Sequence, residues 1–374
     1  MPPKKNKKII LAGGGTGGHI YPAIAIATGL KQEFPDSDIL FIGTNKGLEK
    51  ELVKKAGFSL KTIRVKGFQR KLSFDTIMSV KELAFSAIDS VNIIKKEKPD
   101  IVIGTGGYVA GPIVFFASLM GVHTAIHEQN VTPGITNRIL SKFVEKVFIS
   151  FPDSLKYFPK NKTVLTGNPV RNEITKGIRS QALKKFGLLS NIPTVLCFGG
   201  SQGAARLNDA ILYIINEIKD TKRFQLIHIT GINHYEKTID LLANKGIDLS
   251  KLGHIIIRPY IHEMQDAYAV ADLVISRAGA LSISELNACG KPAILIPLPT
   301  AANRHQDFNA KFMEENGAAI VISEASLSGE KLLDTISNII FDQKRLHQMS
   351  AASKNLVRED VLEKILAEIV KLVR

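Results

Sequence analysis

The sequence predicts an α/β protein built from two doubly wound, Rossmann-like domains, each with its own parallel sheet, that face each other across a cleft. Short apolar runs alternate along the chain with segments of helical period, which is the pattern of parallel sheets covered by helices. A strand, a glycine turn and a helix then follow one another twice, over residues 9–27 and again over 194–215. The length of 374 residues is natural for two domains.

The first predicted unit is a strand over Ile9–Ala12, a turn of sequence Gly13-Gly14-Gly15-Thr16-Gly17-Gly18-His19 and an apolar helix. Glycines accept positive φ and let backbone N–H groups approach a ligand, while the helix directs its positive end to the same place. The turn therefore predicts a site for an anionic group with His19 at its rim. A purely structural glycine turn is the alternative.

The glycine spacing leaves the ligand open, because Gly13, Gly15 and Gly18 also satisfy the dinucleotide fingerprint G-x-G-x-x-G. A nicotinamide site needs an acidic residue at the carboxyl end of the second strand. The strand expected over Asp38–Ile42 begins with its acid and ends in Gly43-Thr44. No Lys-Ser or Lys-Thr follows the glycines, as a Walker loop requires. With these two alternatives disfavoured, the turn is interpreted as a loop that binds a phosphate or a sugar phosphate.

The next expected elements are a strand over Phe58–Lys66 and a segment over 66–98 in which apolar and basic residues are interleaved. One interpretation of this segment is an amphipathic helix that faces the core and carries a solvated basic side. The other is a membrane-facing surface, where each Lys or Arg near an anionic leaflet contributes about 1 kcal/mol.

Two further strands of the first half end in chemically active residues. Ile101–Ile103 leads into the turn Gly104-Thr105-Gly106-Gly107-Tyr108, and Thr124–Ile126 leads into His127-Glu128-Gln129-Asn130. Polar side chains directly after a buried parallel strand stand at the carboxyl edge of the sheet, where ligands bind in open α/β folds. A satisfied loop network is the alternative to a binding site.

The breaking sequence Gly167-Asn168-Pro169-Val170-Arg171 predicts the domain boundary, with a first domain over 1–167 and a second over 168–353. The second domain repeats the opening design with a strand over 194–198, a turn over 199–203 and a helix over 204–215. An apolar stripe predicts a final helix over 354–374, which would be able to return to the first domain.

Ser282 and Glu285 lie three residues apart in a predicted first helical turn that follows the turn over 277–280. They fit a capping box, in which Glu285 satisfies backbone donors. They equally fit a site in which Glu285 accepts two ribose hydroxyls. Polar residues 303–307 open the next helix at the same edge of the sheet.

The net charge of +14 lies mostly in the first half, where residues 1–167 hold 24 Lys and Arg against 13 Asp and Glu. This half is expected to face an anionic partner. No helix-turn-helix, zinc-finger or RNP signature supports nucleic acid as that partner. Cys197 and Cys289 have no partner spacing and indicate reduced thiols in a cytosolic protein. Neither an export signal nor a run of membrane-spanning length is expected.

The ordered motifs resemble the MurG family, transferases that move N-acetylglucosamine (GlcNAc) from its uridine diphosphate ester onto a lipid-linked muramyl-pentapeptide of peptidoglycan synthesis. The resemblance covers nearly the whole chain and implies a GT-B fold, with the donor nucleotide in the second domain and the acceptor in the first. The motifs that carry it are Gly14-Gly15-Thr16-Gly17-Gly18-His19, Gly106-Gly107-Tyr108, His127-Glu128-Gln129-Asn130, Gly167-Asn168-Pro169-Val170-Arg171, Gly199-Gly200-Ser201-Gln202-Gly203-Ala204 and the run from Arg277 to Glu285.

The resemblance also implies site residues. Ser201 and Gln202 would lie by the diphosphate, Ile261 would offer backbone groups to uracil, and Glu285 would take the ribose hydroxyls. Gln306 and Asn130 would hold the sugar. The remaining substrate contacts would come from Thr16, Gly17, Gly18, Tyr108, Arg171, Ala280, Leu281, Ser282, Ile283 and Ser284.

The expected reaction is a direct displacement in which the muramyl 4-hydroxyl attacks the anomeric carbon and inverts it. His19 is the expected base, with Glu128 as the rival base or as its partner. No cofactor and no metal are expected: Asp36-Ser37-Asp38 spells D-x-D but enters a strand, and the helix N-terminus near Ala280 can stabilise departing UDP.

The lipid-linked acceptor implies a peripheral protein on the cytoplasmic side of the cell membrane, bound to an anionic surface. Segment 68–94 and Phe115-Phe116 are the candidate membrane contacts. The rival functions are a UDP-GlcNAc 2-epimerase, which would share the nucleotide site, and a nicotinamide oxidoreductase, which the missing second-strand acid disfavours.

Overall fold

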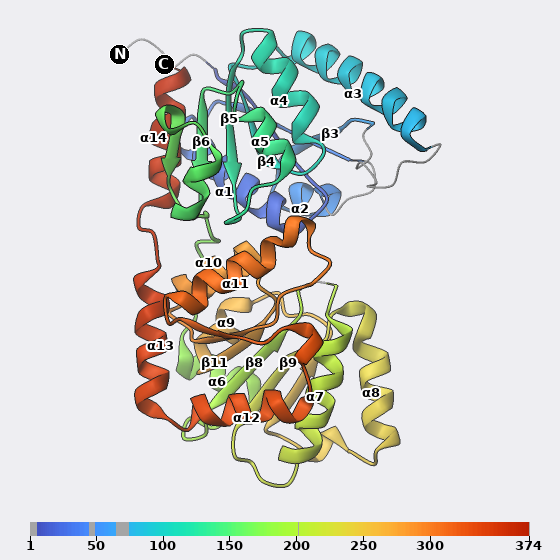
Figure 1. The fold of residues 1–374 in the computed structure, drawn as a ribbon, viewed down its shortest axis with the longest axis vertical. Helices are drawn as coiled ribbons and strands as arrows, with labels where there is room; N and C mark the ends of the chain where they lie inside the picture. The colour runs from blue at the N-terminus through green and yellow to red at the C-terminus, as the bar shows by residue number, and fades with distance from the viewer. Residues whose placement is uncertain (1–5, 45–48, 65–74, 201, 374) are drawn as a thin grey trace. The chain divides into compact units, whose positions relative to one another are not determined.

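The computed structural model describes residues 6–44, 49–64, 75–200 and 202–373, with the backbone alone for residues 75–84. The chain forms two compact units (Figure 1). The first comprises Met1–Val170 and Arg358–Arg374, and the second comprises Arg171–Val357. Each unit contains one parallel sheet with helices packed against it, which confirms the predicted fold class.

The first unit has a seven-stranded parallel sheet within the described residues, in the order β3-β2-β1-β4-β5-β6-β7. The order reverses between β1 and β4, so their carboxyl ends form the switch point at which open α/β sheets bind ligands. The strands are β1 (Lys8–Gly13), β2 (Asp38–Gly43), β3 (Ser59–Thr62), β4 (Ile101–Gly106), β5 (His123–Glu128), β6 (Lys146–Ile149) and β7 (Thr163–Leu165).

Alternate residues of these strands enter two different cores. Ile9 and Leu11 of β1 pack in a cluster with helices α1 and α14, whereas Ile10 and Ala12 pack in a second cluster with α4. This two-residue period places helices on both faces of the sheet. The helices are α1 (Gly17–Glu33), α2 (Glu49–Lys55), α3 (Asp75–Glu97), α4 (Ala110–Leu119), α5 (Ile135–Leu140) and α14 (Val361–Val373).

Helix α14 comes from the far end of the sequence and packs on α1 (Figure 1). Its Ile365 and Ile369 are fully buried, and burying each such side chain is worth about 1.5–3 kcal/mol. The fit on α1 is close, because a Cβ at Gly29 would lie 2.8 Å from Leu366 Cδ1. An ion pair of 2.6 Å between Lys146 and Glu368 adds a polar tie to β6.

The second unit repeats the design with a six-stranded parallel sheet among its described residues, in the order β10-β9-β8-β11-β12-β13. Its switch point lies between β8 and β11. The strands are β8 (Thr194–Phe198), β9 (Gln225–Ile229), β10 (Ile255–Arg258), β11 (Leu273–Ser276), β12 (Ala293–Leu295) and β13 (Ala319–Val321). The helices are α6 (Arg179–Phe186), α7 (Ala205–Ile218), α8 (Tyr235–Asn244), α9 (Met264–Val270), α10 (Ala280–Ala288), α11 (His305–Glu315), α12 (Gly329–Ile340) and α13 (Gln343–Asn355).

Several expected element boundaries differ from the structure. Strands β4 and β5 continue through Gly106 and Glu128, into residues that were expected to follow the strands. The strand expected over Phe58–Lys66 ends at Thr62, and residues 65–74 of the basic–apolar segment lie outside the described residues. The single helix expected over 354–374 is two helices, because α13 ends at Asn355 and α14 begins at Val361. Asp360, in the break, has a φ of 56°, which no α-helix accommodates. No helix of the described ranges is both long enough and apolar enough to cross a membrane.

Candidate functional site

The glycine turn between β1 and α1 places His19 at the carboxyl end of the first sheet. Gly15 has a φ of +85°, which glycine adopts without strain. Thr16 caps α1 with its backbone, since its carbonyl accepts the N–H of His19 at 3.1 Å, and no side chain caps the helix. His19 is half-buried and belongs to the first turn of α1, whereas the sequence placed it at the rim of the glycine turn.

The hydrogen bonds of His19 determine which ring nitrogen carries the proton. Nδ1 lies 3.1 Å from the carbonyl oxygen of Gly14, which can only accept, and 3.4 Å from Thr16 Oγ1. The neutral ring therefore carries its hydrogen on Nδ1 and has its lone pair on Nε2. Burial lowers the pKa of His19, opposed by the Gly14 carbonyl. A neutral imidazole with a lone pair on Nε2 is what a general base requires.

The glycines of the β4–α4 turn form the surface on which the His19 ring lies. A Cβ at Gly106, where φ is +106°, would lie 2.9 Å from Cδ2 and 3.1 Å from Nε2 of His19. A Cβ at Gly107 would lie 2.5 Å from the carbonyl oxygen of Gly14. The structure thus brings the two predicted glycine motifs of the first unit into contact, with Tyr108 beside them and 56% exposed.

Glu128, at the end of β5, is buried and accepts four hydrogen bonds. Asn130 donates from its backbone and from Nδ2 to Oε1 at 3.0 and 3.1 Å. Asn137 Nδ2 and the Gly134 backbone donate to Oε2 at 2.8 and 3.1 Å. Burial raises the pKa of Glu128, opposed by these donors. Both carboxylate oxygens are occupied within the protein, so this side chain holds the loop over 128–137 in shape.

The other polar residues of this motif connect it to His19. Gln129 Nε2 donates to the Thr105 carbonyl at 2.8 Å, and Thr105 Oγ1 donates to the His19 carbonyl at 2.9 Å. His127 is fully buried with Nε2 on the Gly167 carbonyl at 3.0 Å, and burial lowers its pKa to about 4. His127 is therefore neutral and structural at ordinary pH.

In the second unit, the turn between β8 and α7 is packed against the turn after β9. A Cβ at Gly203 would lie 2.1 Å from the Thr230 carbonyl oxygen. Gln202 Oε1 accepts from Asn233 Nδ2 at 3.1 Å. Ser201, expected beside a diphosphate, lies outside the described residues.

Helix α10 has a bare N-terminus at the carboxyl end of β11. Its N-cap is Gly279, and no side chain caps the helix. Residues 280–285 follow in its first turns, where Ser284 Oγ donates to the Ala280 carbonyl at 2.9 Å. The backbone N–H groups of this turn and the positive helix end suit an anionic group.

Glu285 of α10 is 6% exposed and is hydrogen-bonded to two side chains from outside its helix, those of Arg171 and Tyr268. Arg171 donates to Oε1 from Nε at 3.2 Å and from Nη2 at 2.9 Å. Tyr268 Oη donates to Oε2 at 3.2 Å. The capping-box interpretation of Ser282 and Glu285 is wrong, because α10 begins at Ala280 and the Glu285 carboxylate bonds to side chains.

The remaining predicted residues of the second unit lie at the ends of β10 and β12. Ile261 follows β10 and is buried. Gln306, in the first turn of α11, accepts the N–H of Leu298 on Oε1 at 2.9 Å. Asn303 and Arg304 before it have φ of 51° and 52°, a strained turn typical of functional loops.

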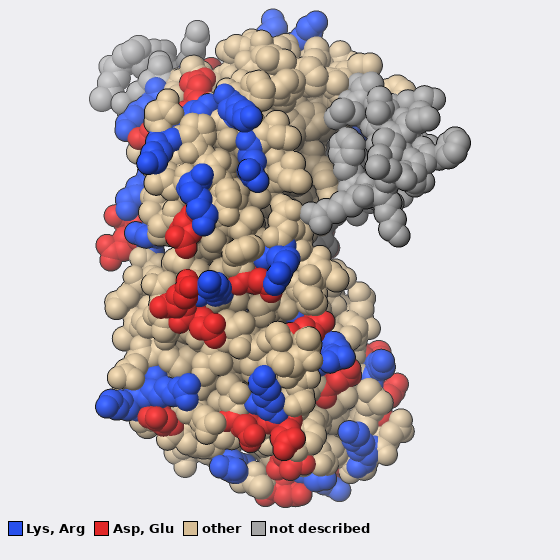
Figure 2. Space-filling model, in the orientation of Figure 1, with Lys and Arg blue, Asp and Glu red and all other residues tan. Residues whose placement is uncertain are grey.

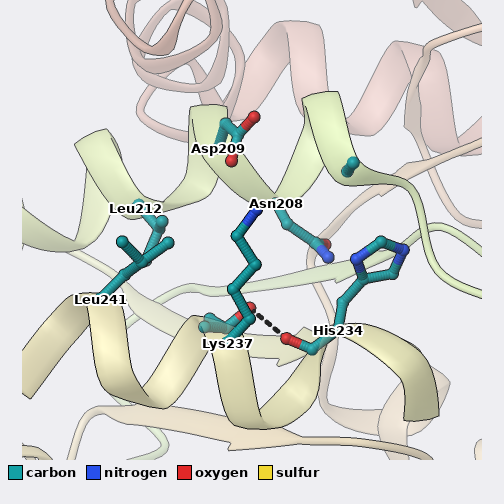
Figure 3. A pocket seen from close by; sticks show the side chains of 8 residues that line it. Asn208, Asp209, Leu212, His234, Lys237 and Leu241 are labelled. Carbon is teal, nitrogen blue, oxygen red and sulfur yellow. Dashed lines mark hydrogen bonds between the residues drawn. The ribbon is translucent and has the colours of Figure 1, made fainter.

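A small hollow lies between α7 and α8 of the second unit (Figure 3). Asn208, Asp209, His234 and Lys237 line it, and Thr238 Oγ1 donates to the His234 carbonyl at 2.8 Å. Its space of about 20 Å³ is enough for about one water molecule, so it is not a sugar-nucleotide site. Among the residues described, no cluster of His, Cys, Asp and Glu could hold a metal ion.

Sequence reasoning missed Glu49, which lies beneath the first glycine turn. It is fully buried at the start of α2, and its carboxylate accepts the N–H of Gly15 at 3.4 Å and that of Thr44 at 2.7 Å. An acid thus does lie at the end of β2, brought there by α2. Its carboxylate is completely buried beneath the turn, so it does not offer the ribose contact of a nicotinamide site.

Family models match both units of the chain. The glycosyltransferase family 28 N-terminal domain matches residues 9–149, and the family 28 C-terminal domain matches residues 194–365. A Desulforamulus reducens protein named UDP-N-acetylglucosamine–N-acetylmuramyl-(pentapeptide) pyrophosphoryl-undecaprenol N-acetylglucosamine transferase is 46% identical over 96% of this chain and 97% of its own length. A Bacillus pumilus protein of the same name is 44% identical over 93% of this chain and 94% of its own.

Solved structures also match the chain over nearly its full length. The crystal structure of Acinetobacter baumannii MurG is 29% identical, with a TM-score of 0.76, and the match covers 98% of this chain and 99% of that one. A UDP-GlcNAc 2-epimerase from Neisseria meningitidis, bound to UDP-GlcNAc, has a TM-score of 0.68 over 97% of this chain and all of its own. It is 14% identical, so this second likeness concerns the fold alone.

Proposed function

The chain belongs to the MurG family within glycosyltransferase family 28, and we propose that it transfers GlcNAc from UDP-GlcNAc to a lipid-linked muramyl-pentapeptide, converting lipid I to lipid II. The observation that carries the proposal in the geometry is His19, whose Nε2 lone pair stands at the carboxyl edge of the first sheet. The identity of the two substrates is inferred from the names of the relatives that match this chain over nearly its full length.

The second unit binds the donor in this proposal. The N-terminus of α10 carries about half an elementary positive charge and faces the diphosphate, to which Gln202 and Ser201 also bind. Glu285 accepts the ribose hydroxyls, and Ile261 offers its backbone to uracil. Gln306 and Asn130 hold the sugar through their amides. Arg171 and the helix end together favour the negative charge that grows on UDP as it leaves.

The first unit binds the acceptor and supplies the base. The muramyl 4-hydroxyl attacks the anomeric carbon, its proton passes to His19 Nε2, and the bond from the anomeric carbon to the diphosphate oxygen breaks with inversion. Thr16, Gly17, Gly18 and Tyr108 line the acceptor. Glu128 orders the loop that carries Asn130, because its own oxygens are occupied by four protein donors.

Turnover with a lipid-linked muramyl-pentapeptide acceptor tests the proposal through release of UDP. His19→Ala should lower kcat by about 10² to 10⁴, with the affinity for UDP retained. His123→Ala removes an exposed histidine of the same unit and is the matched control, expected to behave as the unchanged protein. Near-normal turnover of His19→Ala would reject the base. Formation of the 2-epimer of UDP-GlcNAc in the absence of an acceptor would show that the protein is an epimerase and not a transferase.

The first unit also carries the features of a surface that binds an anionic membrane. Exposed apolar side chains gather on the packed helices α3, α4 and α5 and just after α5, at Phe85, Ile88, Leu119, Met120, Ile135, Ile139 and Phe143. Arg138 and Lys142 are exposed beside them. On the face of this unit seen in Figure 2, Lys and Arg predominate, whereas the second unit shows both signs interspersed. Phe115 and Phe116 are half-buried and support this face from beneath.

A membrane-bound acceptor and this surface together support a peripheral location on the cytoplasmic side of the cell membrane. Sedimentation with anionic liposomes should carry the protein down at low salt and less of it at high salt, because each Lys or Arg contributes about 1 kcal/mol that salt screens. Ile139→Glu should weaken the binding, and Ile232→Glu, at a still more exposed isoleucine of the second unit, should not. Failure to bind at low salt would reject the surface.

A further inference from the structure

Glu49 is a buried carboxylate held on one side by β2 and on the other by the glycine turn. Thr44 donates to Oε1 from its backbone and from Oγ1, both at 2.7 Å, and Gly15 donates its N–H to Oε2 at 3.4 Å. Burial alone would raise the pKa of Glu49, but the hydrogen bonds from Thr44 and the Gly15 backbone outweigh it, and the net pKa is lowered. The group is therefore an anion inside the first unit.

The donor on Gly15 and the acceptor that holds His19 belong to one peptide group. The carbonyl of Gly14 and the N–H of Gly15 are the two ends of the same planar unit, and in a trans peptide they point in opposite directions. Glu49 accepts from one end, and His19 Nδ1 donates to the other at 3.1 Å. A carboxylate, a peptide and an imidazole thus form one chain of hydrogen bonds.

This peptide needs holding, because both of its residues are glycine. Gly15 has a φ of +85°, and a Cβ there would meet nothing within 4 Å, so the turn is sterically permissive on that side. A flipped peptide would direct its N–H at His19 Nδ1. The neutral ring would then carry its hydrogen on Nε2, where a base needs its lone pair. The orientation of one peptide decides whether His19 can accept a proton.

We propose that Glu49 is a positioning residue of the transferase. Its carboxylate fixes the Gly14–Gly15 peptide, and the Gly14 carbonyl then holds His19 in the Nδ1–H tautomer with Nε2 ready to accept a proton. The contribution to turnover rests on the proposed function, whereas the tautomer of His19 does not.

The tautomer is measured by long-range ¹H–¹⁵N correlation spectra of the full chain labelled at histidine, with His19→Ala used to assign the signal. The unchanged protein should show the Nδ1–H pattern for His19. Glu49→Gln loses the anion and brings an amide N–H₂ to a site that offers only donors, so the Nε2–H tautomer should become a major form. Glu51→Gln makes the same change at an exposed acid two residues along α2 and should keep the Nδ1–H pattern.

Turnover gives the second measurement. Glu49→Gln should lower kcat about 10-fold to 100-fold, part of the effect of a lost general base, with the KM for UDP-GlcNAc little changed. Should Glu49→Gln fail to fold, Thr44→Val, which removes one donor, should shift the tautomer in the same direction by less. A folded Glu49→Gln, or in its place Thr44→Val, that keeps the Nδ1–H tautomer overturns the inference. A chain with the Nδ1–H tautomer and no transferase activity overturns the proposed function instead.

Discussion

Replacing Tyr268 by Phe removes one hydroxyl from the site of the second unit and leaves the ring in place. The ring is 1% exposed and packs edge-on against Phe198, with centroids 6.1 Å apart. Burial and the neighbouring Glu285 carboxylate raise the pKa of Tyr268 well above its ordinary value, so the hydroxyl is a donor throughout the working pH range. Tyr268→Phe therefore leaves Glu285 Oε2 without this donor while Arg171 still holds Oε1.

The magnitude follows from the burial of Glu285 and the length of the bond. A hydrogen bond to a charged group is worth about 1.5–3 kcal/mol. At 3.2 Å this one is long for an O–H donor, which indicates the low end, about 1.5 kcal/mol. That energy corresponds to about tenfold in an equilibrium constant. We expect the free energy of unfolding to fall by about 1 to 1.5 kcal/mol and the affinity for UDP to weaken about three- to tenfold.

The assay is calorimetric titration of the protein with UDP and with 2′-deoxyuridine diphosphate. If the carboxylate of Glu285 accepts ribose hydroxyls, the unchanged protein prefers UDP, and Tyr268→Phe should reduce that preference. Tyr213→Phe, at an exposed tyrosine of α7, is the matched control and should keep it. A Tyr268→Phe variant with unchanged preference and unchanged UDP affinity would refute the role of Tyr268 in holding Glu285 for the ribose.

Three further perturbations follow from the described contacts. Gly106→Ala should lower both stability and kcat, because its Cβ would lie 2.9 Å from the His19 ring at a φ of +106°. Gly57→Ala is the control: with a φ of +81° and no atom within 4 Å of the added Cβ, it should lower stability alone. Equal losses of kcat in the two variants would contradict a role for the contact between Gly106 and His19. Glu128→Gln replaces a carboxylate that accepts four hydrogen bonds by an amide, so both the free energy of unfolding, by about 1–3 kcal/mol, and kcat should fall. A loss of kcat at unchanged stability would instead indicate that Glu128 is the catalytic base. Burial lowers the pKa of His228 from 6.5 to about 4. Between pH 6.5 and about 4, the histidine is therefore protonated in the unfolded chain and neutral in the folded chain. Stability measured by urea unfolding should fall as the pH drops from 6.5 to about 4, and His228→Leu should flatten that slope; an equal slope would place the effect elsewhere.

The sheets could be predicted from the sequence because their signals are local. Apolar runs that end in glycine turns mark β1, β4, β8 and β11, and the repeat of this design indicates two units. The break between α13 and α14 could not be predicted in the same way, because the apolar stripe continues across it. Asp360 takes a φ of 56° there, a conformation that Asp adopts more readily than most residues but that its presence in a sequence does not by itself predict.

The site divides along the same line. The glycine turn that leads to His19 follows β1, and residues 127–130 form the end of β5 and the loop after it, so their position at the sheet edge could be read from order alone. Glu285 could not be distinguished from a helix cap, because Arg171 lies 114 residues away in the sequence. Glu49 was invisible for a similar reason: a charged residue at a helix start is ordinary, and its burial arises only when α2 folds under a turn that lies more than thirty residues earlier.

The return of α14 to the first unit has a consequence for biosynthesis. A nascent chain tends to complete its domains in order as they leave the ribosome. Here the earlier unit must wait with the side of α1 that meets Leu362 and Leu366 uncovered, while all 187 residues of Arg171–Val357 are made. The later unit is thus free to reach its native state first. A ribosome that stalls near residue 357 would leave the apolar side of α1 exposed and open to binding by chaperones.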